Sequence, residues 1–156
     1  MTNILFSLEK IGPYHNSRFN SILDLKEFNL NVLESDPVSI KYPWKEKIDK
    51  SYRVFKLKEN IQNNSNFKNQ LSEILKICSP NIIFITGWDQ KISHYLLVIS
   101  YLEKIPVVMI SDSRFKDSKR NFFLEYLKKI LLKGCSSAIV AGFESENYIA
   151  KLGFKN

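Results

Sequence analysis

Cysteine is scarce in this chain: Cys78 and Cys135 are the only two in 156 residues. They lie far apart, and neither belongs to a C-x-x-C pair or has a histidine neighbour, so the sequence indicates no disulfide framework and no zinc site. This usage is typical of a reducing, cytoplasmic setting. The first apolar run, Ile4 to Leu8, lacks a basic segment before it, and no run approaches the about 20 residues of a membrane span. We therefore expect a cytoplasmic protein that is soluble or peripheral at the inner face of the membrane.

Several motifs of common enzyme classes are missing as well. G-x-G-x-x-G and G-x-x-x-x-G-K-[ST] are absent, which removes the main support for a Rossmann dehydrogenase or a kinase-like enzyme. G-x-S-x-G and H-E-x-x-H are also absent, and His94 lies in an apolar helical segment where a core or capping role is expected. The sequence therefore assigns no catalytic residue, and we expect no metal and no cofactor.

Positive charge is in excess, with a formal net charge of +7. Such an excess favours anionic partners, whether phosphate groups, acidic lipids or nucleic acid. Most of it is scattered lysine, which we interpret as solvated surface. No recognised nucleic-acid-binding motif accompanies it, so we expect no nucleic-acid partner.

Six apolar runs have the length of strands, and most are continuous, as in strands that are covered on both faces. The run 28–33 alternates with asparagines and is expected nearer an edge of the sheet. The runs are Ile4 to Leu8, Phe28 to Leu33, Tyr52 to Leu57, Ile82 to Ile85, Val107 to Ile110 and Ala138 to Ala141.

Helical patterns lie between the strands. The stripe from Phe67 to Cys78 stops before Pro80, whose ring disfavours helix at the preceding residue. Tyr95 to Leu102 is almost wholly apolar and is expected to be buried on most sides. The stripe from Phe122 to Leu131 is expected to pack on the sheet, with Gly134 as the C-cap. Alternating strands and helices predict an α/β fold: a single Rossmann-like doubly wound domain over 1–156, with a mostly parallel sheet of about six strands and helices on both faces.

Four loops that are polar or contain glycine follow four of these strands. In doubly wound sheets ligands bind beyond the carboxyl ends of the strands, where the strand order reverses. With the order 3-2-1-4-5-6, one crevice would gather these loops. The loops are Gly12 to His15, Gly87 to Asp89, Ser111 to Ser113 and Gly142 to Ser145.

Each loop has a binding interpretation and a structural alternative. Gly12 permits close backbone approach, and His15 and Arg18 could hold an anion at a helix start, or His15 could be a surface residue beside a tight turn. Trp88 could stack on a sugar or fill a gap between helices, and Asp89 could accept hydroxyl hydrogen bonds or cap a helix. Ser111, Asp112 and Ser113 offer donors and acceptors for a polyhydroxy ligand. The charged residues that follow are interpreted as a structural ion network; they are Asp117, Arg120, Glu125 and Lys128.

Taken together, these features resemble the N-terminal half of GT-B-fold glycosyltransferases of the family 4 (group 1) type. The resemblance runs from Met1 to Phe154. It rests on the Ile11 to His15 turn with Arg18, Glu34 with Tyr42 and Trp44, Gly87-Trp88, Ser111 to Ser113 with Asp117 and Arg120, and Ala141-Gly142 leading to Tyr148, Leu152 and Gly153.

The resemblance implies an acceptor-binding half of a sugar transferase, whose partners would be a nucleotide-sugar donor and a sugar or glycan acceptor. Gly12 would approach donor phosphate or acceptor, whereas Trp88, Asp89 and Ser111 to Ser113 would line the acceptor side, with Gly142 at the last strand end. The donor-binding C-terminal domain and its E-x7-E carboxylates are absent. We therefore expect this chain to be incomplete without that domain in cis or in trans, as a truncated gene product or a subunit of a split enzyme.

Two alternatives stay open. The chain could be a non-catalytic Rossmann-like module that binds sugar or phosphate. The aromatic and basic helix of Lys119 to Lys133 could also make peripheral contact with an anionic membrane, although its apolar stripe is more simply the face that packs on the sheet.

Overall fold

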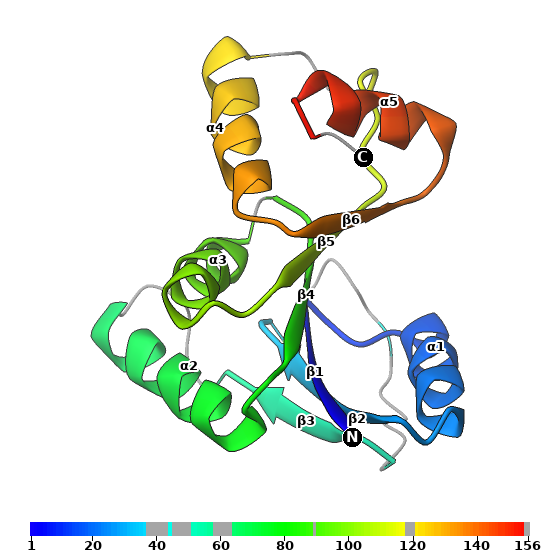
Figure 1. Cartoon of the computed structure of the whole chain (residues 1–156), viewed down its shortest axis with the longest axis vertical. Helices are drawn as coiled ribbons and strands as arrows, with labels where there is room; N and C mark the ends of the chain where they lie inside the picture. Colours follow the sequence, from blue (N-terminus) through cyan, green and yellow to red (C-terminus); the bar gives the residue numbers. More distant parts are fainter. Residues whose placement is uncertain (37–43, 45–50, 58–63, 89, 118–120, 155–156) are drawn as a thin grey trace. The chain divides into compact units, whose positions relative to one another are not determined.

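The computed structural model describes every residue except 37–43, 45–50, 58–63, 89, 118–120 and 155–156 (Figure 1). Asp89, Arg120 and Tyr42, which the sequence singled out, lie outside the described residues, and so does most of the loop between the second and third strands.

The strands form a six-stranded parallel sheet in the order β3-β2-β1-β4-β5-β6. This confirms the predicted α/β fold, the strand count and the doubly wound order. β2 lies one strand in from the edge strand β3, and its Asn31 is buried, so the alternation with asparagine does not mark a solvent-facing strand. The strands are β1 (Thr2–Leu8), β2 (Phe28–Glu34), β3 (Arg53–Lys56), β4 (Ile82–Thr86), β5 (Val107–Ser111) and β6 (Ser137–Val140).

Five helices alternate with these strands. They are α1 (Pro13–Asp24), α2 (Asn64–Cys78), α3 (Lys91–Glu103), α4 (Phe122–Lys133) and α5 (Phe143–Lys151). Their ends follow local chemistry: α1 begins with proline at its first position, where the missing N–H costs nothing, and α2 stops at Cys78, two residues before Pro80. Gly134 is the C-cap of α4, as predicted.

The chain divides within β4 into two compact units, 1–83 and 84–156, which are described separately. In the first unit α1 lies on one side of β1, β2 and β3, and α2 lies on the other (Figure 1). The register pairs β1 with β2 from Thr2–Phe28 to Leu8–Glu34, so that the loop after β1 and the end of β2 lie at the same edge. Its core includes Leu5, Leu33 and Leu71, which are fully buried.

In the second unit α3 lies beside β4 and β5, whereas α4 and α5 lie beyond β6 and pack against each other (Figure 1). Leu132 of α4 packs with Tyr148, Ile149 and Leu152 in a buried cluster. Gly134 lies close to α3, because a Cβ there would stand 3.4 Å from the Leu97 side chain.

Two burial predictions are wrong. α3 is not buried on most sides, since Val98, Tyr101 and Leu102 are 61–79% exposed while Ile92 and Leu96 of the same helix are fully buried. The apolar residues of α4 do not form a packed stripe either. Most of them are exposed, namely Phe122, Phe123, Tyr126, Leu127 and Ile130, because the helix is held mainly through Leu132 and a polar cluster described below.

No helix among the described residues is long and apolar enough to cross a membrane. The membrane contact predicted for the α4 segment stays a prediction.

Candidate functional site

In the first unit, the loop between β1 and α1 is pinned by two acceptors. The N–H of Ile11 donates to Oε1 of the fully buried Glu34 at 2.7 Å, and the N–H of Gly12 donates to Nδ1 of His15 at 2.9 Å. Glu34 comes from the end of β2, and Lys56 at the end of β3 lies 3.7 Å from its second oxygen. Successive strand ends therefore fix the loop, as the parallel register requires.

His15 acts first as a cap of α1. Its own N–H donates to the Gly12 carbonyl at 3.0 Å while its Nδ1 accepts from the Gly12 N–H, a reciprocal pair at the helix start. Burial, and next the charge of Arg18, hold the pKa of His15 below its usual value. The imidazole is thus kept neutral, and only Nε2 is left for a ligand.

Gly12 and Arg18 have partners within the chain. A Cβ at Gly12 would stand 3.1 Å from Nε1 of Trp44, so the space that the glycine leaves is used by an indole. The Arg18 guanidinium lies 4.6 Å from the centre of the Tyr14 ring. The structure brings Gly12, His15 and Arg18 together at one helix start, and their contact with a ligand stays a prediction.

In the second unit, Trp88 is braced at the end of β4. Gly87 takes a φ of 76°, which favours glycine, and directs the chain so that the Trp88 ring packs against the cluster of Leu132 and Tyr148. Its Nε1–H donates to Ser113 Oγ at 3.3 Å, and His94 Nε2 lies 2.9 Å from its carbonyl oxygen. This favours the gap-filling interpretation of Trp88. His94 is exposed rather than in the core, and its contact with a carbonyl ahead of the helix does not cap α3.

Ser111, the last residue of β5, and Ser113 extend this series of hydrogen bonds. Ser111 is buried, and its Oγ accepts from the Ser113 N–H at 3.3 Å. Ser113 is half-buried, and the Asp112 carboxylate is exposed. Asp112 and Ser113 are therefore the polar side chains at this strand end that a ligand can reach.

The residues that follow β6 are hydrogen-bonded to the end of β5. The Ala141 N–H donates to the Ser111 carbonyl, and Ser145 Oγ donates to the Asp112 carbonyl at 3.1 Å. Gly142 caps α5 with a φ of 130°, and a side chain placed there would meet nothing within 4 Å. Ser145, buried in the first turn of α5, belongs to the predicted loop Gly142 to Ser145 but was not singled out within it. The available signal was its place in a helix start that follows a strand end.

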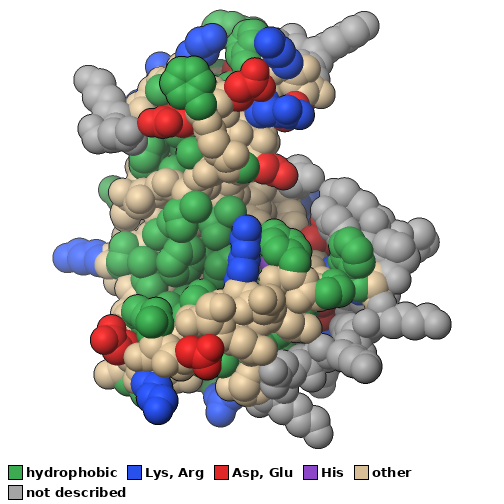
Figure 2. Space-filling model, turned by 90° about the vertical axis from the view of Figure 1, so that its right-hand side faces the viewer, with side chains coloured by type: hydrophobic (Ala, Val, Ile, Leu, Met, Phe, Trp, Pro, Cys, Tyr) green, Lys and Arg blue, Asp and Glu red, His purple; other side chains and the backbone are tan. Residues whose placement is uncertain are grey.

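The charged residues after β5 form two clusters rather than one network. Asp117 accepts from the backbone and Nε of Arg114, and Glu144 lies near Arg114 and Lys116. Figure 2 shows acidic and basic side chains next to one another over α5, at the top of the view.

The second cluster joins α4 to α5. Lys128 Nζ donates to Glu125 at 3.1 Å and to the Tyr148 hydroxyl at 2.9 Å, and that hydroxyl donates to Glu125. Glu125 and Lys128 are thus paired within the chain, in line with their interpretation as structural residues. Among the described residues, no group of three His, Cys, Asp or Glu side chains could hold a metal ion.

Comparison of the sequence with protein-family models finds no match, and neither does a search of the curated proteins. Solved structures do match. A UDP-GlcNAc 2-epimerase from Methanocaldococcus jannaschii superposes with a TM-score of 0.61 at 12% identity, over 97% of this chain and 43% of its own. Another UDP-N-acetylglucosamine 2-epimerase gives 0.63 at 14% identity, over 99% of this chain and 46% of its own. A putative enzyme of the same name from Listeria monocytogenes gives 0.62 at 10% identity, over 99% and 43%.

At these identities the likeness shows the fold alone. It fits a domain of the GT-B-like fold and does not single out the family 4 glycosyltransferases. The chain spans less than half the length of each of these structures.

Proposed function

We propose that this chain forms one Rossmann-like half of a sugar-nucleotide-processing enzyme with a GT-B-like fold. The observation that carries the proposal is the likeness, over 97–99% of the chain, to three structures named as UDP-GlcNAc 2-epimerases. Because the chain covers less than half of each, the activity would need a second domain, supplied in cis or in trans.

Within this half, the ligand site is proposed at the carboxyl ends of β5 and β6. Asp112 and Ser113 present a carboxylate and a hydroxyl there, and Gly142 leaves open space at the start of α5. Hydroxyl groups of a sugar both donate and accept hydrogen bonds, which suits this pair. Trp88 and Ser111 position Ser113 through their hydrogen bonds to it.

The finer assignment concerns the reaction. From the sequence we expect sugar transfer, with this half on the acceptor side, whereas the named structures are epimerases. Both reactions start from a nucleotide sugar. Binding of its separate parts therefore tells which half this chain is: an acceptor half binds the sugar or a glycan alone, and a donor half binds the nucleotide.

The test is a titration of the isolated chain followed by amide NMR, with UDP-GlcNAc, UDP and N-acetylglucosamine as separate probes. We expect UDP-GlcNAc to shift the amide signals of Ser111 to Ser113 and of Gly142. Asp112→Asn should weaken binding about tenfold, since a hydrogen bond to a charged group contributes about 1.5–3 kcal/mol. Asp24→Asn, on an exposed carboxylate of α1, is the matched control and should leave the affinity unchanged.

A lack of shifts at these amides with millimolar UDP-GlcNAc would overturn the proposed site. Shifts with N-acetylglucosamine alone would support the acceptor role, and shifts with UDP alone would contradict it. Saturable binding without turnover, even together with a second domain, would favour the non-catalytic binding module.

A further inference from the structure

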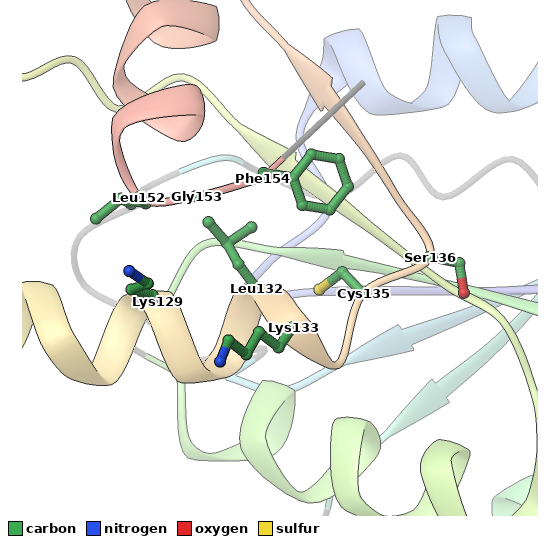
Figure 3. A pocket seen from close by; sticks show the side chains of 8 residues that line it. All are labelled: Lys129, Leu132, Lys133, Cys135, Ser136, Leu152, Gly153 and Phe154. Carbon is green, nitrogen blue, oxygen red and sulfur yellow. The ribbon is translucent and has the colours of Figure 1, made fainter.

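A cavity lies at the opposite end of β6 from the proposed sugar site. Its volume is about 210 Å³, and it opens between the last turn of α4 and the segment that follows α5 (Figure 3). Ser136 borders it just before β6, whereas Ala141 and Gly142 follow β6 at the other end. The strand therefore separates the two places, and a ligand here would not be the one bound beside Asp112.

One wall of this cavity is cationic. Lys129 and Lys133 both line it, and because they are four residues apart they lie on the same side of α4. The Lys129 side chain crosses toward the end of α5, where its Cε stands 3.4 Å from the position of a Gly153 Cβ (Figure 3). Gly153 has a φ of 92° and no side chain, which leaves room for that lysine.

Among the residues that the structure describes, nothing nearby neutralises these charges. No carboxylate lines the cavity, and no ion pair of Lys129 or Lys133 is found among the described residues. Glu125, the acidic residue of α4, is paired with Lys128 and Tyr148 instead. An anion entering the cavity would meet uncompensated positive charge.

The other wall is apolar. Leu132 and Leu152 are 2% and 6% exposed and belong to the buried cluster of this unit, and Phe154 packs against that cluster. Figure 3 shows the Phe154 ring and Leu132 facing the same space. Phe154 is only partly buried, so an apolar part of a ligand can replace water against its ring.

The remaining lining groups are neutral. Cys135 donates its S–H to the Leu131 carbonyl at 3.6 Å, and burial raises the pKa of the thiol to about 11. It stays protonated at neutral pH, so the lysines alone set the charge of the cavity. The volume corresponds to about seven water molecules at roughly 30 Å³ each, which limits a ligand to a small molecule.

We propose that this cavity binds a small amphiphilic anion. Its carboxylate or phosphate group pairs with Lys129 and Lys133, and its short apolar body lies against Phe154. This inference does not rest on the proposed sugar function, since the two sites share no residue.

The experiment uses Cys135 as a reporter inside the cavity. The rate at which a thiol reagent labels Cys135 is followed by mass spectrometry at about pH 9, where a fraction of the thiol is ionised and reacts. Hexanoate, hexyl phosphate, hexanol and inorganic phosphate are the probes, and affinities are measured by calorimetry. Hexanoate and hexyl phosphate are expected to slow the labelling at millimolar concentration, and hexanol and inorganic phosphate to do so far less. Labelling that none of the probes slows would overturn the proposal, and so would equal protection by hexanol and hexanoate.

A charge-matched pair of variants completes the test. Lys129→Gln is expected to weaken hexanoate binding about tenfold, whereas Lys91→Gln, which removes an exposed lysine of α3 outside the cavity, leaves it unchanged. An equal loss in both variants would show general attraction by a basic protein and would refute a specific site. Circular dichroism of both variants verifies that the fold is retained.

Discussion

The Tyr148 hydroxyl joins α5 to α4, and its removal should measurably destabilise the second unit. Tyr148 is 1% exposed, and its hydroxyl donates to Glu125 at 2.9 Å while it accepts from Lys128 Nζ at 2.9 Å. Tyr148→Phe deletes one oxygen and keeps the ring, so the ring packing against Trp88 and Phe115 should survive. The variant therefore isolates the hydrogen bonds.

The magnitude follows from the two charged partners. A hydrogen bond to a charged group contributes about 1.5–3 kcal/mol. Glu125 and Lys128 are about one-fifth exposed, at 22% and 21%, and keep their own contact at 3.1 Å, so water and that contact offset part of the loss. We expect the free energy of unfolding to fall by about 2 kcal/mol.

Urea denaturation provides the measurement, with Tyr126→Phe as the matched control. Tyr126 is also on α4 but is 56% exposed, and loss of its hydroxyl should change stability by less than about 0.5 kcal/mol. A double-mutant cycle of Tyr148→Phe with Lys128→Met should give a coupling energy of about 1 kcal/mol. Equal effects of Tyr148→Phe and Tyr126→Phe would refute the bridging role.

The same cluster predicts an alkaline limit to stability. Burial raises the pKa of Tyr148 above its usual 10.0. For Lys128 burial lowers the pKa, but the hydrogen bonds with Tyr148 and Glu125 outweigh it, and the pKa lies above the usual 10.5. The folded state thus keeps protons that the unfolded state releases, so this stabilisation is present below about pH 10 and is lost as the pH rises further. In Tyr148→Phe the decline should be shallower.

Two further predictions concern the first unit. Glu34→Ala removes the buried acceptor of the Ile11 N–H and should lower the free energy of unfolding by about 2–3 kcal/mol. Glu34→Gln keeps Oε1 and should lower it clearly less. If Glu34→Ala has no larger effect than Glu27→Ala, which changes an exposed residue, Glu34 does not hold the loop. Because the pKa of His15 is held below its usual 6.5, the folded state resists protonation there, so unfolding titrations should show stability lost as the pH falls below about 6.5. His15→Gln should flatten this acid limb; an unchanged limb in that variant would contradict the lowered pKa of His15.

The elements of the fold could be read from local sequence because their causes are local. Continuous apolar runs such as 82–85 and 107–110 need cover on both faces, which only a parallel sheet between helices provides. Pro80 stops α2 through its own backbone chemistry, and Gly134 takes the C-cap position of α4, although its φ of −81° is one that any residue can adopt. The strand-end loops followed from the same order, because parallel strands place their carboxyl ends at one edge.

The roles of single side chains were harder to predict from the sequence. Trp88 has a ring of the kind that stacks on ligands, yet this ring fills the space beside Leu132 and Tyr148, which lie 44 and 60 positions further along the chain. His15 is of a residue type that often binds ligands, yet its Nδ1 accepts a hydrogen bond from the Gly12 N–H at the start of its own helix. A side chain's role depends on which neighbours reach it, and those neighbours are distant in sequence.

The sequence by itself determined the order and type of the elements and which loops follow the carboxyl ends of the strands, because hydrophobic periodicity and helix stops act over a few residues. Only the tertiary structure decided which faces are covered. It left the aromatic side of α4 exposed, linked Lys128 to Tyr148 across 20 positions, and opened the cavity beside Lys129 and Gly153. Each of these depends on how helices and strands from separate segments come together, since burial, ion pairing and cavities are properties of packed surfaces and not of the pattern along one element.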